Sequence, residues 1–186
     1  MFTRQWYKAI IAHATNYTLF YRNVENATVQ WNTTQLQKIT RIGYDTNDYG
    51  TPSMYKPRTS LTTYGGVIFG DGDAPPTVDD YKLSGNLITS INATLKSIYR
   101  EDNFTLGCYE IKAEYTVANT GTKSITIREI GLIAAGGANN SQSAMKCLLE
   151  RTVLDEPVTI PRGSSAVITY TIRIFDPSYT ERFDLP

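Results

Sequence analysis

The stretch NTGTKSITIREIGLIAAGG, residues 119–137, begins like one arm of a β-hairpin and then changes its pattern. Ile125 and Ile127 alternate with polar neighbours, which is the period of a half-buried strand. The next apolar pair, Ile130 and Leu132, falls on the opposite parity. An extra residue at Arg128-Glu129, a β-bulge, would return this pair to the core side. A strand covered on both faces would tolerate either parity without a bulge.

Three other runs of the second half also alternate with a period of two, which is typical of strands. They are YEIKAEYTV at 109–117, MKCLLERTVL at 145–154 and SAVITYTIRIF at 165–175. The segment DEPVTIPRGSS, residues 155–165, with Pro157, Pro161 and Gly163, is expected as a connector. Four antiparallel strands cannot close a core alone, so a second sheet from the first half should cover them. We therefore predict a mainly β chain, an antiparallel β-sandwich with a short N-terminal helix and long irregular loops.

The first half of the chain has weaker patterns. Residues 1–16 are expected to form an N-terminal docking helix, because Thr3 can cap it and apolar side chains then follow one stripe. Residues 17–186 are expected to form one β-sandwich domain, starting with two strand-like runs over 17–31 that are split by a turn at 23–26. The segment 33–44 fits a strand or a short helix equally well. A loop-rich insertion is predicted around 45–63, where Pro, Gly, Asp and Asn are frequent.

The segment YGGVIFGDGDAPPTVDDYKLSG, residues 64–85, indicates a strand, a loop and a brief helix in that order. Val67 to Phe69 form the short strand. Thr77 and Asp80 have the spacing of a capping box, and Gly85 would end the helix. The acidic residues of this segment lack the ligand spacing of a calcium-binding loop, because prolines stand at the ligand positions.

Composition excludes several classes of function. The 186 residues include 18 basic and 18 acidic side chains, so the chain has no general electrostatic attraction for nucleic acid. No apolar run approaches the roughly 20 residues that cross a bilayer, and no secretory signal is recognisable, so we expect a soluble protein without a membrane partner. Cys108 and Cys147 are expected to be reduced, buried thiols. His13 is the single histidine, and no acid/base, metal or phosphate-binding motif accompanies it, so we predict no enzyme and no cofactor.

Glu129 and Arg151 stand out as charges within apolar strands. Arg151 shares parity with Cys147, Leu149 and Val153, so it should point toward the apolar side of its strand. A charge there requires a partner. Glu129, on the expected neighbouring strand, is the candidate partner. The alternative is that both side chains lie at the rim of the sheet in water.

Three segments resemble virion structural proteins of tailed bacteriophages, in particular modules associated with the tail fibre, baseplate or connector. They are GDGDAPPTVDDYKLSG at 70–85, ANTGTKSITIREIGLIA at 118–134 and LLERTVLDEPVTIPRGSSAVITYTI at 148–172. The resemblance covers roughly residues 64–175. Its most specific parts are ITIREIGL and ERTVLDEPVTIPRGSS. It implies a β-sandwich that assembles into a symmetric substructure of the particle.

The resemblance also implies a location and partners. The chain is expected in the virion, assembled in the host cytoplasm, where it would contact copies of itself and other virion proteins in a ring or fibre. Because it is short and has no internal repeat, a collar, adaptor, tail or head-fibre role fits better than a full-length fibre. A module that binds a host-surface carbohydrate or receptor is the alternative. Aromatic residues favour interface cores, and the candidate contacts are Trp6, Tyr7, Ile10, His13, Tyr49 and Tyr55.

Overall fold

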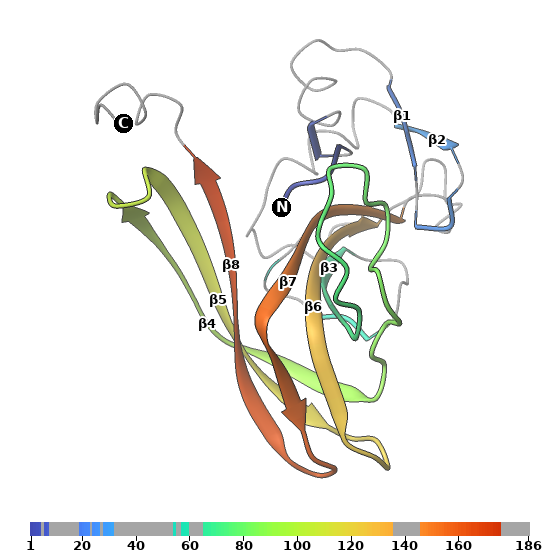
Figure 1. The fold of residues 1–186 in the computed structure, drawn as a ribbon, viewed down its shortest axis with the longest axis vertical. Helices are drawn as coiled ribbons and strands as arrows, with labels where there is room; N and C mark the ends of the chain where they lie inside the picture. Colours follow the sequence, from blue (N-terminus) through green and yellow to red (C-terminus); the bar gives the residue numbers. More distant parts are fainter. Residues whose placement is uncertain are drawn as a thin grey trace.

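The computed structural model describes residues 1–4, 6–7, 19–22, 24–26, 28–31, 54, 57–59, 65–135 and 146–175. These residues are mainly β, with every pair of neighbouring strands antiparallel (Figure 1). No helix within them is long and apolar enough to cross a membrane.

Two three-stranded sheets make up most of the described chain. The first has the order β3-β6-β7 and the second the order β4-β5-β8. A two-stranded ribbon, β1-β2, follows the N-terminal segment, as the pattern over 17–31 predicted, and its turn includes Asn26 at a φ of 66°. The bounds are β1 Leu19–Arg22, β2 Thr28–Trp31, β3 Gly66–Gly70, β4 Ile91–Asn103, β5 Cys108–Asn119, β6 Ile125–Ala135, β7 Lys146–Ile160 and β8 Ser165–Phe175.

The four predicted strands of the second half do not form one sheet, which corrects the sequence-based arrangement. β5 pairs with β8, whereas β6 pairs with β7, so the chain crosses between the sheets twice. The two crossing turns, 120–124 and 161–164, lie at the same end, where the sheets approach each other, and the sheets diverge toward the opposite end (Figure 1). The Asn119 side chain links this closed end by donating hydrogen bonds to the carbonyls of Lys123 (2.8 Å) and Ile160 (2.9 Å).

One hydrophobic core takes side chains from both sheets. Phe69 of β3 packs edge to face on Tyr115 of β5, with ring centroids 5.9 Å apart. The Tyr115 hydroxyl donates a hydrogen bond to the carbonyl of Met54, which is itself buried in this core. The two sheets are therefore joined by apolar contact. Their fully buried contributions include Val67, Phe69, Ile127, Ile130, Leu132, Ala113, Tyr115, Val117 and Tyr170.

The parity change of β6 coincides with a register shift at Arg128, but the additional residues do not lie at Arg128-Glu129, where the sequence pattern placed them. Ile127 pairs with Val158 and Glu129 pairs with Val153, so the register shifts at Arg128, and the additional residues belong to β7. Ile127, Ile130 and Leu132 consequently all reach the main core. Beyond the shift β6 is covered on both faces, because Ile133 packs on the other side of the sheet with Ile68, Leu83 and Leu148.

Sequence reasoning did not identify β4, and it ended β7 too early. In β4 the apolar alternation of Ile91, Ala93 and Leu95 passes to Ile98, and the register shifts between Leu95 and Ser97. The segment expected as a connector continues β7 as far as Ile160. Pro157 is tolerated there because it lies at the irregularity opposite Arg128.

The N-terminus begins as an extended segment along β7. Phe2 pairs antiparallel with Glu150, and the Thr3 N–H donates to the Leu149 carbonyl at 2.8 Å. Trp6 and Tyr7 then turn back toward the Thr3 carbonyl, with N to O distances of 3.0 and 3.5 Å. Residues 8–16 lie outside the described part of the chain, so the docking helix stays a prediction. Cys108 and Cys147 are free and buried, as predicted.

Candidate functional site

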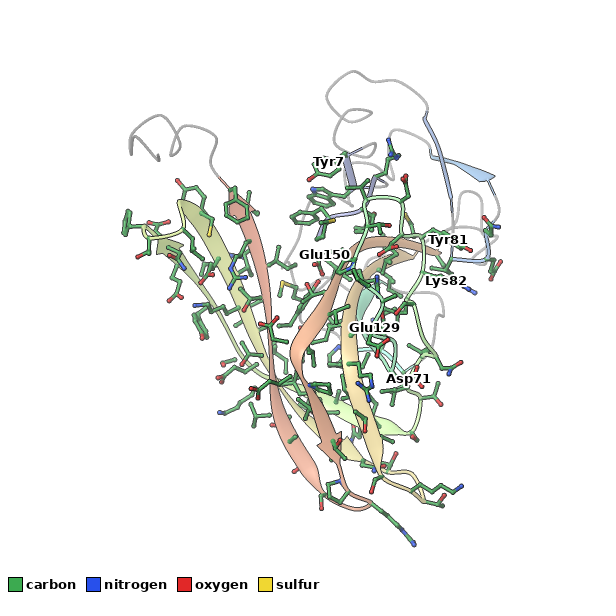
Figure 2. All side chains as sticks on the ribbon, in the orientation of Figure 1. Tyr7, Asp71, Tyr81, Lys82, Glu129 and Glu150 are labelled. Carbon is green, nitrogen blue, oxygen red and sulfur yellow. The ribbon has the colours of Figure 1, made fainter. Side chains whose placement is uncertain are left out.

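The structure brings Glu129 and Arg151 together on neighbouring strands. Arg151 Nε lies 2.6 Å from Glu129 Oε2, and both side chains are buried. The alternative position at a wet sheet rim therefore does not apply. The pair sits under the segment 70–87, which crosses the face of the β3-β6-β7 sheet that points away from the main core, and Figure 2 shows Glu129 and Asp71 there.

The Arg151 guanidinium is surrounded by acceptors from this segment. Nη1 donates to Asp80 Oδ2 at 2.7 Å and to the Pro75 carbonyl at 3.4 Å. Nη2 donates to the Ala74 carbonyl at 2.5 Å. The planar fork of arginine suits such a site, because its donors reach several acceptors at once. Arg151, which lies on β7, thus connects Glu129 of β6 to the 70–87 loop that covers this face of the sheet.

The Glu129 carboxylate fixes the two ends of the same loop. Its Oε1 accepts from the N–H groups of Gly72 (3.2 Å) and Gly85 (2.8 Å). Its Oε2 accepts from the N–H of Ser84 (3.0 Å) and from the Ser84 hydroxyl (3.1 Å). Gly72 and Gly85 approach so closely that a Cβ on either would overlap the backbone of the other. Together with Arg151, the carboxylate accepts five hydrogen bonds.

The electrostatics keep this centre ionised. Burial acts to raise the pKa of Glu129, but the hydrogen bonds from Gly85, Arg151 and Ser84 outweigh it and hold this pKa below its ordinary value. For Arg151, burial acts to lower the pKa, and the bonds to Glu129 and Asp80 raise it overall. A charged pair at this depth is stable because its remaining hydrogen-bonding groups are also paired.

Thr77 and Asp80 do not begin a helix, which corrects the sequence-based expectation for 77–85. Asp80 Oδ2 accepts from the Thr77 N–H at 3.0 Å, and the Thr77 hydroxyl donates to Oδ1 at 2.8 Å. Only the first is a capping-box contact, because the Asp80 N–H donates to the Thr77 carbonyl at 3.2 Å, which closes a turn at Val78–Asp79, and not to the Thr77 hydroxyl. The N–H groups of Ser84 and Gly85 donate to the Glu129 carboxylate and therefore do not take part in a helix that continues from this turn. Among the described residues no group of three or more His, Cys, Asp or Glu side chains could hold a metal ion.

The predicted interface residues are only partly described. Trp6 stacks on Phe2 with ring centroids 5.0 Å apart and is 8% exposed, so it packs within its own chain. Tyr7 is 51% exposed. Ile10, His13, Tyr49 and Tyr55 lie outside the described residues.

A pocket of about 360 Å³ lies between β7, β8 and the N-terminal segment. Glu150, which sequence reasoning did not select, lies at its wall and accepts hydrogen bonds from the Tyr170 hydroxyl and from Thr152 Oγ1, the latter at 2.6 Å. Glu150 points toward β8, whereas Glu129 points toward the 70–87 loop (Figure 2). The sequence signal that could have identified Glu150 is its position next to Arg151, because two adjacent charged residues are unusual in an apolar strand. The lining residues are Met1, Phe2, Tyr7, Glu150, Thr152, Thr171, Ile172, Arg173 and Phe175.

No protein-family model matches the chain, and neither a curated protein nor a solved structure matches it. The site is therefore interpreted from its geometry. Glu129 and Arg151 direct their hydrogen bonds to the 70–87 loop, which makes them an anchor that holds this loop on the sheet.

Proposed function

We propose that this chain is a non-enzymatic structural component of a tailed-phage virion, associated with a collar, adaptor, tail or head fibre, that acts by oligomeric assembly. The two sheets form a β-sandwich in this proposal, and the sandwich is the rigid body of the subunit. Its partners are copies of itself and other virion proteins. Repetition around a ring or along a fibre converts weak contacts into a durable assembly.

The observation that carries the proposal is the convergence of the three resembling segments on one centre. Asp80 comes from GDGDAPPTVDDYKLSG, Glu129 from ITIREIGL and Arg151 from ERTVLDEPVTIPRGSS. Arg151 contacts both carboxylates, at 2.6 Å and 2.7 Å. One residue from each of the three segments thus serves the same structural purpose, the attachment of a loop to a sheet. That purpose fits an architectural protein better than it fits a catalyst.

The segments proposed to grip neighbours are residues 1–16 and the loop at 45–63. Tyr7 supports this role, because it is exposed at the pocket between β7 and β8. Met1–Thr3, by contrast, belong to the subunit itself, since they pair along β7. Deletion of residues 1–14 would therefore remove the segment that covers the edge of β7 as well as the proposed docking segment.

The test is the assembly state of the full chain. Light scattering after size exclusion should give a mass several times that of one chain, and negative-stain images should show closed rotational symmetry. Mass spectrometry of particles made by the encoding genome should recover the chain in a constant ratio to other virion proteins. A monomer at every accessible concentration, or particles that lack the chain, would contradict the proposal.

Recognition of a host-surface carbohydrate is the second candidate, and the pocket between β7 and β8 favours it. Tyr7 and Phe175 offer aromatic faces there, and Arg173, whose side chain is 49% exposed, offers hydrogen-bond donors. A glycan array on the full chain tests it. Binding that Phe175→Ala abolishes, by a chain that stays monomeric, would favour this candidate over assembly.

A further inference from the structure

The two three-stranded sheets have four edge strands, β3, β7, β4 and β8, and other parts of the chain cover the first two. Beside β7, the Arg151 N–H donates to the Met1 carbonyl at 3.1 Å and Phe2 pairs with Glu150. Beside β3, the Arg58 N–H donates to the Val67 carbonyl at 2.7 Å, and Pro57 forms a bridge to the same residue. An uncovered edge is a template for another strand, and proteins commonly protect it.

The edge strand β4 is protected by its composition and shape. It carries Lys96 at its register shift. Toward its end it carries three consecutive charged residues, 100–102. Charges and a bulge on an edge strand both oppose pairing with another chain.

The edge strand β8 has neither kind of protection within the described part of the chain. Its 11 residues, SAVITYTIRIF, contain no proline and no glycine. They pair with β5 without a register shift, from Ala118 opposite Ser165 to Cys108 opposite Phe175. The single charge, Arg173, is held by Glu110 at 2.7 Å. Val167 and Phe175 are 54% and 62% exposed, so β8 also presents apolar surface.

We propose that the outer edge of β8 pairs antiparallel with β8 of a second copy, so that the β4-β5-β8 sheet continues across a two-fold axis near Thr169. This inference rests on the proposed function and names the contact by which the subunit assembles. A two-fold interface uses the same patch twice, so one unprotected strand is sufficient to form it.

The side chains of β8 are compatible with this axis. Thr169 would lie opposite Thr169 of the second copy, and Val167 opposite its Thr171, both favourable cross-strand pairs. Arg173 would lie opposite Ser165 of the second copy. The two Arg173 positions are then eight residues apart along the strand, roughly 26 Å at a rise of about 3.3 Å per residue. This exceeds the screening length of about 8 Å at physiological salt.

The pocket provides room beside the second half of this edge. It lies along Thr171–Arg173 and Phe175, with Tyr7 and Glu150 on its other side. The axis at Thr169 would bring residues 163–167 of the second copy there. Val167 would lie opposite Thr171, and the other four, Gly163, Ser164, Ser165 and Ala166, have small side chains that limit clashes with the pocket wall.

Thr169→Lys tests the contact against a matched control, Thr94→Lys. Thr94 and Thr169 are both exposed, and both lie on the outer face of the same sheet, one on each edge strand. Across β5, Thr169 is opposite Glu114, so an ammonium group is tolerated in the single subunit. In the pair, two ammonium groups would oppose each other. We expect at least about tenfold weaker self-association for Thr169→Lys, by sedimentation, and wild-type association for Thr94→Lys.

Cysteine crosslinking provides a second readout. Directly opposite residues of antiparallel strands have Cβ atoms about 4.5–5.5 Å apart, close to disulfide range. Mild oxidation should therefore give a covalent dimer of Thr169→Cys and none of Thr94→Cys. If the wild type is oligomeric but neither Thr169 variant differs from its control, the β8 contact is wrong and the proposed assembly function stands. A monomeric wild type would overturn both.

Discussion

Glu129→Gln is the sharpest perturbation of the loop anchor. The substitution keeps the size of the side chain but removes its charge and replaces one acceptor oxygen by an NH₂ donor. That group would face the N–H and O–H donors that now bind the carboxylate, at Gly72, Ser84 and Gly85. Arg151 would keep Asp80 but lose its partner at 2.6 Å.

The expected loss of stability follows from the burial of the pair. Removal of one partner of a buried ion pair costs about 3–5 kcal/mol, and here Asp80 alone is left to compensate the buried charge of Arg151. For a chain of 186 residues, each kcal/mol lowers the Tm by roughly 2–4 °C. The expected decrease is therefore roughly 6–20 °C at neutral pH.

Thermal unfolding by circular dichroism at pH 7 measures this decrease. Glu156→Gln is the matched control, because Glu156 is exposed on β7 and undergoes the same chemical change. Its Tm should stay close to that of the wild type. Hydrogen exchange should also show faster exchange of the Ser84 and Gly85 amides in Glu129→Gln alone. A Tm for Glu129→Gln equal to that of the control would refute the anchoring role.

Three further predictions concern neighbouring groups. Arg151→Lys should lower stability by about 1–3 kcal/mol in urea unfolding, because one ammonium group cannot reach the four acceptors of the guanidinium; an unchanged midpoint would contradict this. Lys112 and Arg173 lower the pKa of Glu110 from 4.5 to about 2. The ionised Glu110 therefore contributes fully to the free energy of unfolding above pH 4.5, and this contribution is lost as the pH falls toward 2. The Tm of Glu110→Gln should accordingly approach that of the wild type in acid, and a constant difference across this range would count against the linkage. Asn119→Ala should cost about 1–3 kcal/mol in the same urea assay, since a buried hydrogen bond to the Ile160 carbonyl and a partly buried one to the Lys123 carbonyl are lost. Stability equal to that of the wild type would show that the two turns do not depend on Asn119.

Local pattern was sufficient for much of the secondary structure. Strict alternation predicted β5 and β8, because both strands lie with one face on the core and the other toward solvent. The parity change in β6 pointed to the register shift at Arg128, since a shift is the local means by which a strand changes faces. The same parity analysis selected Glu129 and Arg151 as partners. Each of these inferences depends on neighbours within a few residues.

Other features depend on contacts between distant residues, and pattern did not reveal them. The spacing of Thr77 and Asp80 is the same for a helix and for the observed turn, and the local pattern does not reveal that Asp80 binds Arg151 of β7 or that the N–H groups of Ser84 and Gly85 bind Glu129 of β6. β4 escaped prediction because its own register shift interrupts the alternation.

The sequence by itself determined where most strands of the second half lie and selected Glu129 and Arg151 as candidate partners, because both inferences follow from the period of apolar side chains along the chain. Only the structure showed that the two charges are buried together. Only the tertiary structure decided that β5 and β8 belong to one sheet and β6 and β7 to the other. It also decided that Met1–Thr3 cover β7 while the edge of β8 has no such cover in the described residues. The physical reason is that strand pairing and edge protection depend on backbone hydrogen bonds between segments up to about 150 residues apart in the sequence. The period of apolar residues within one strand does not specify which other strand it pairs with.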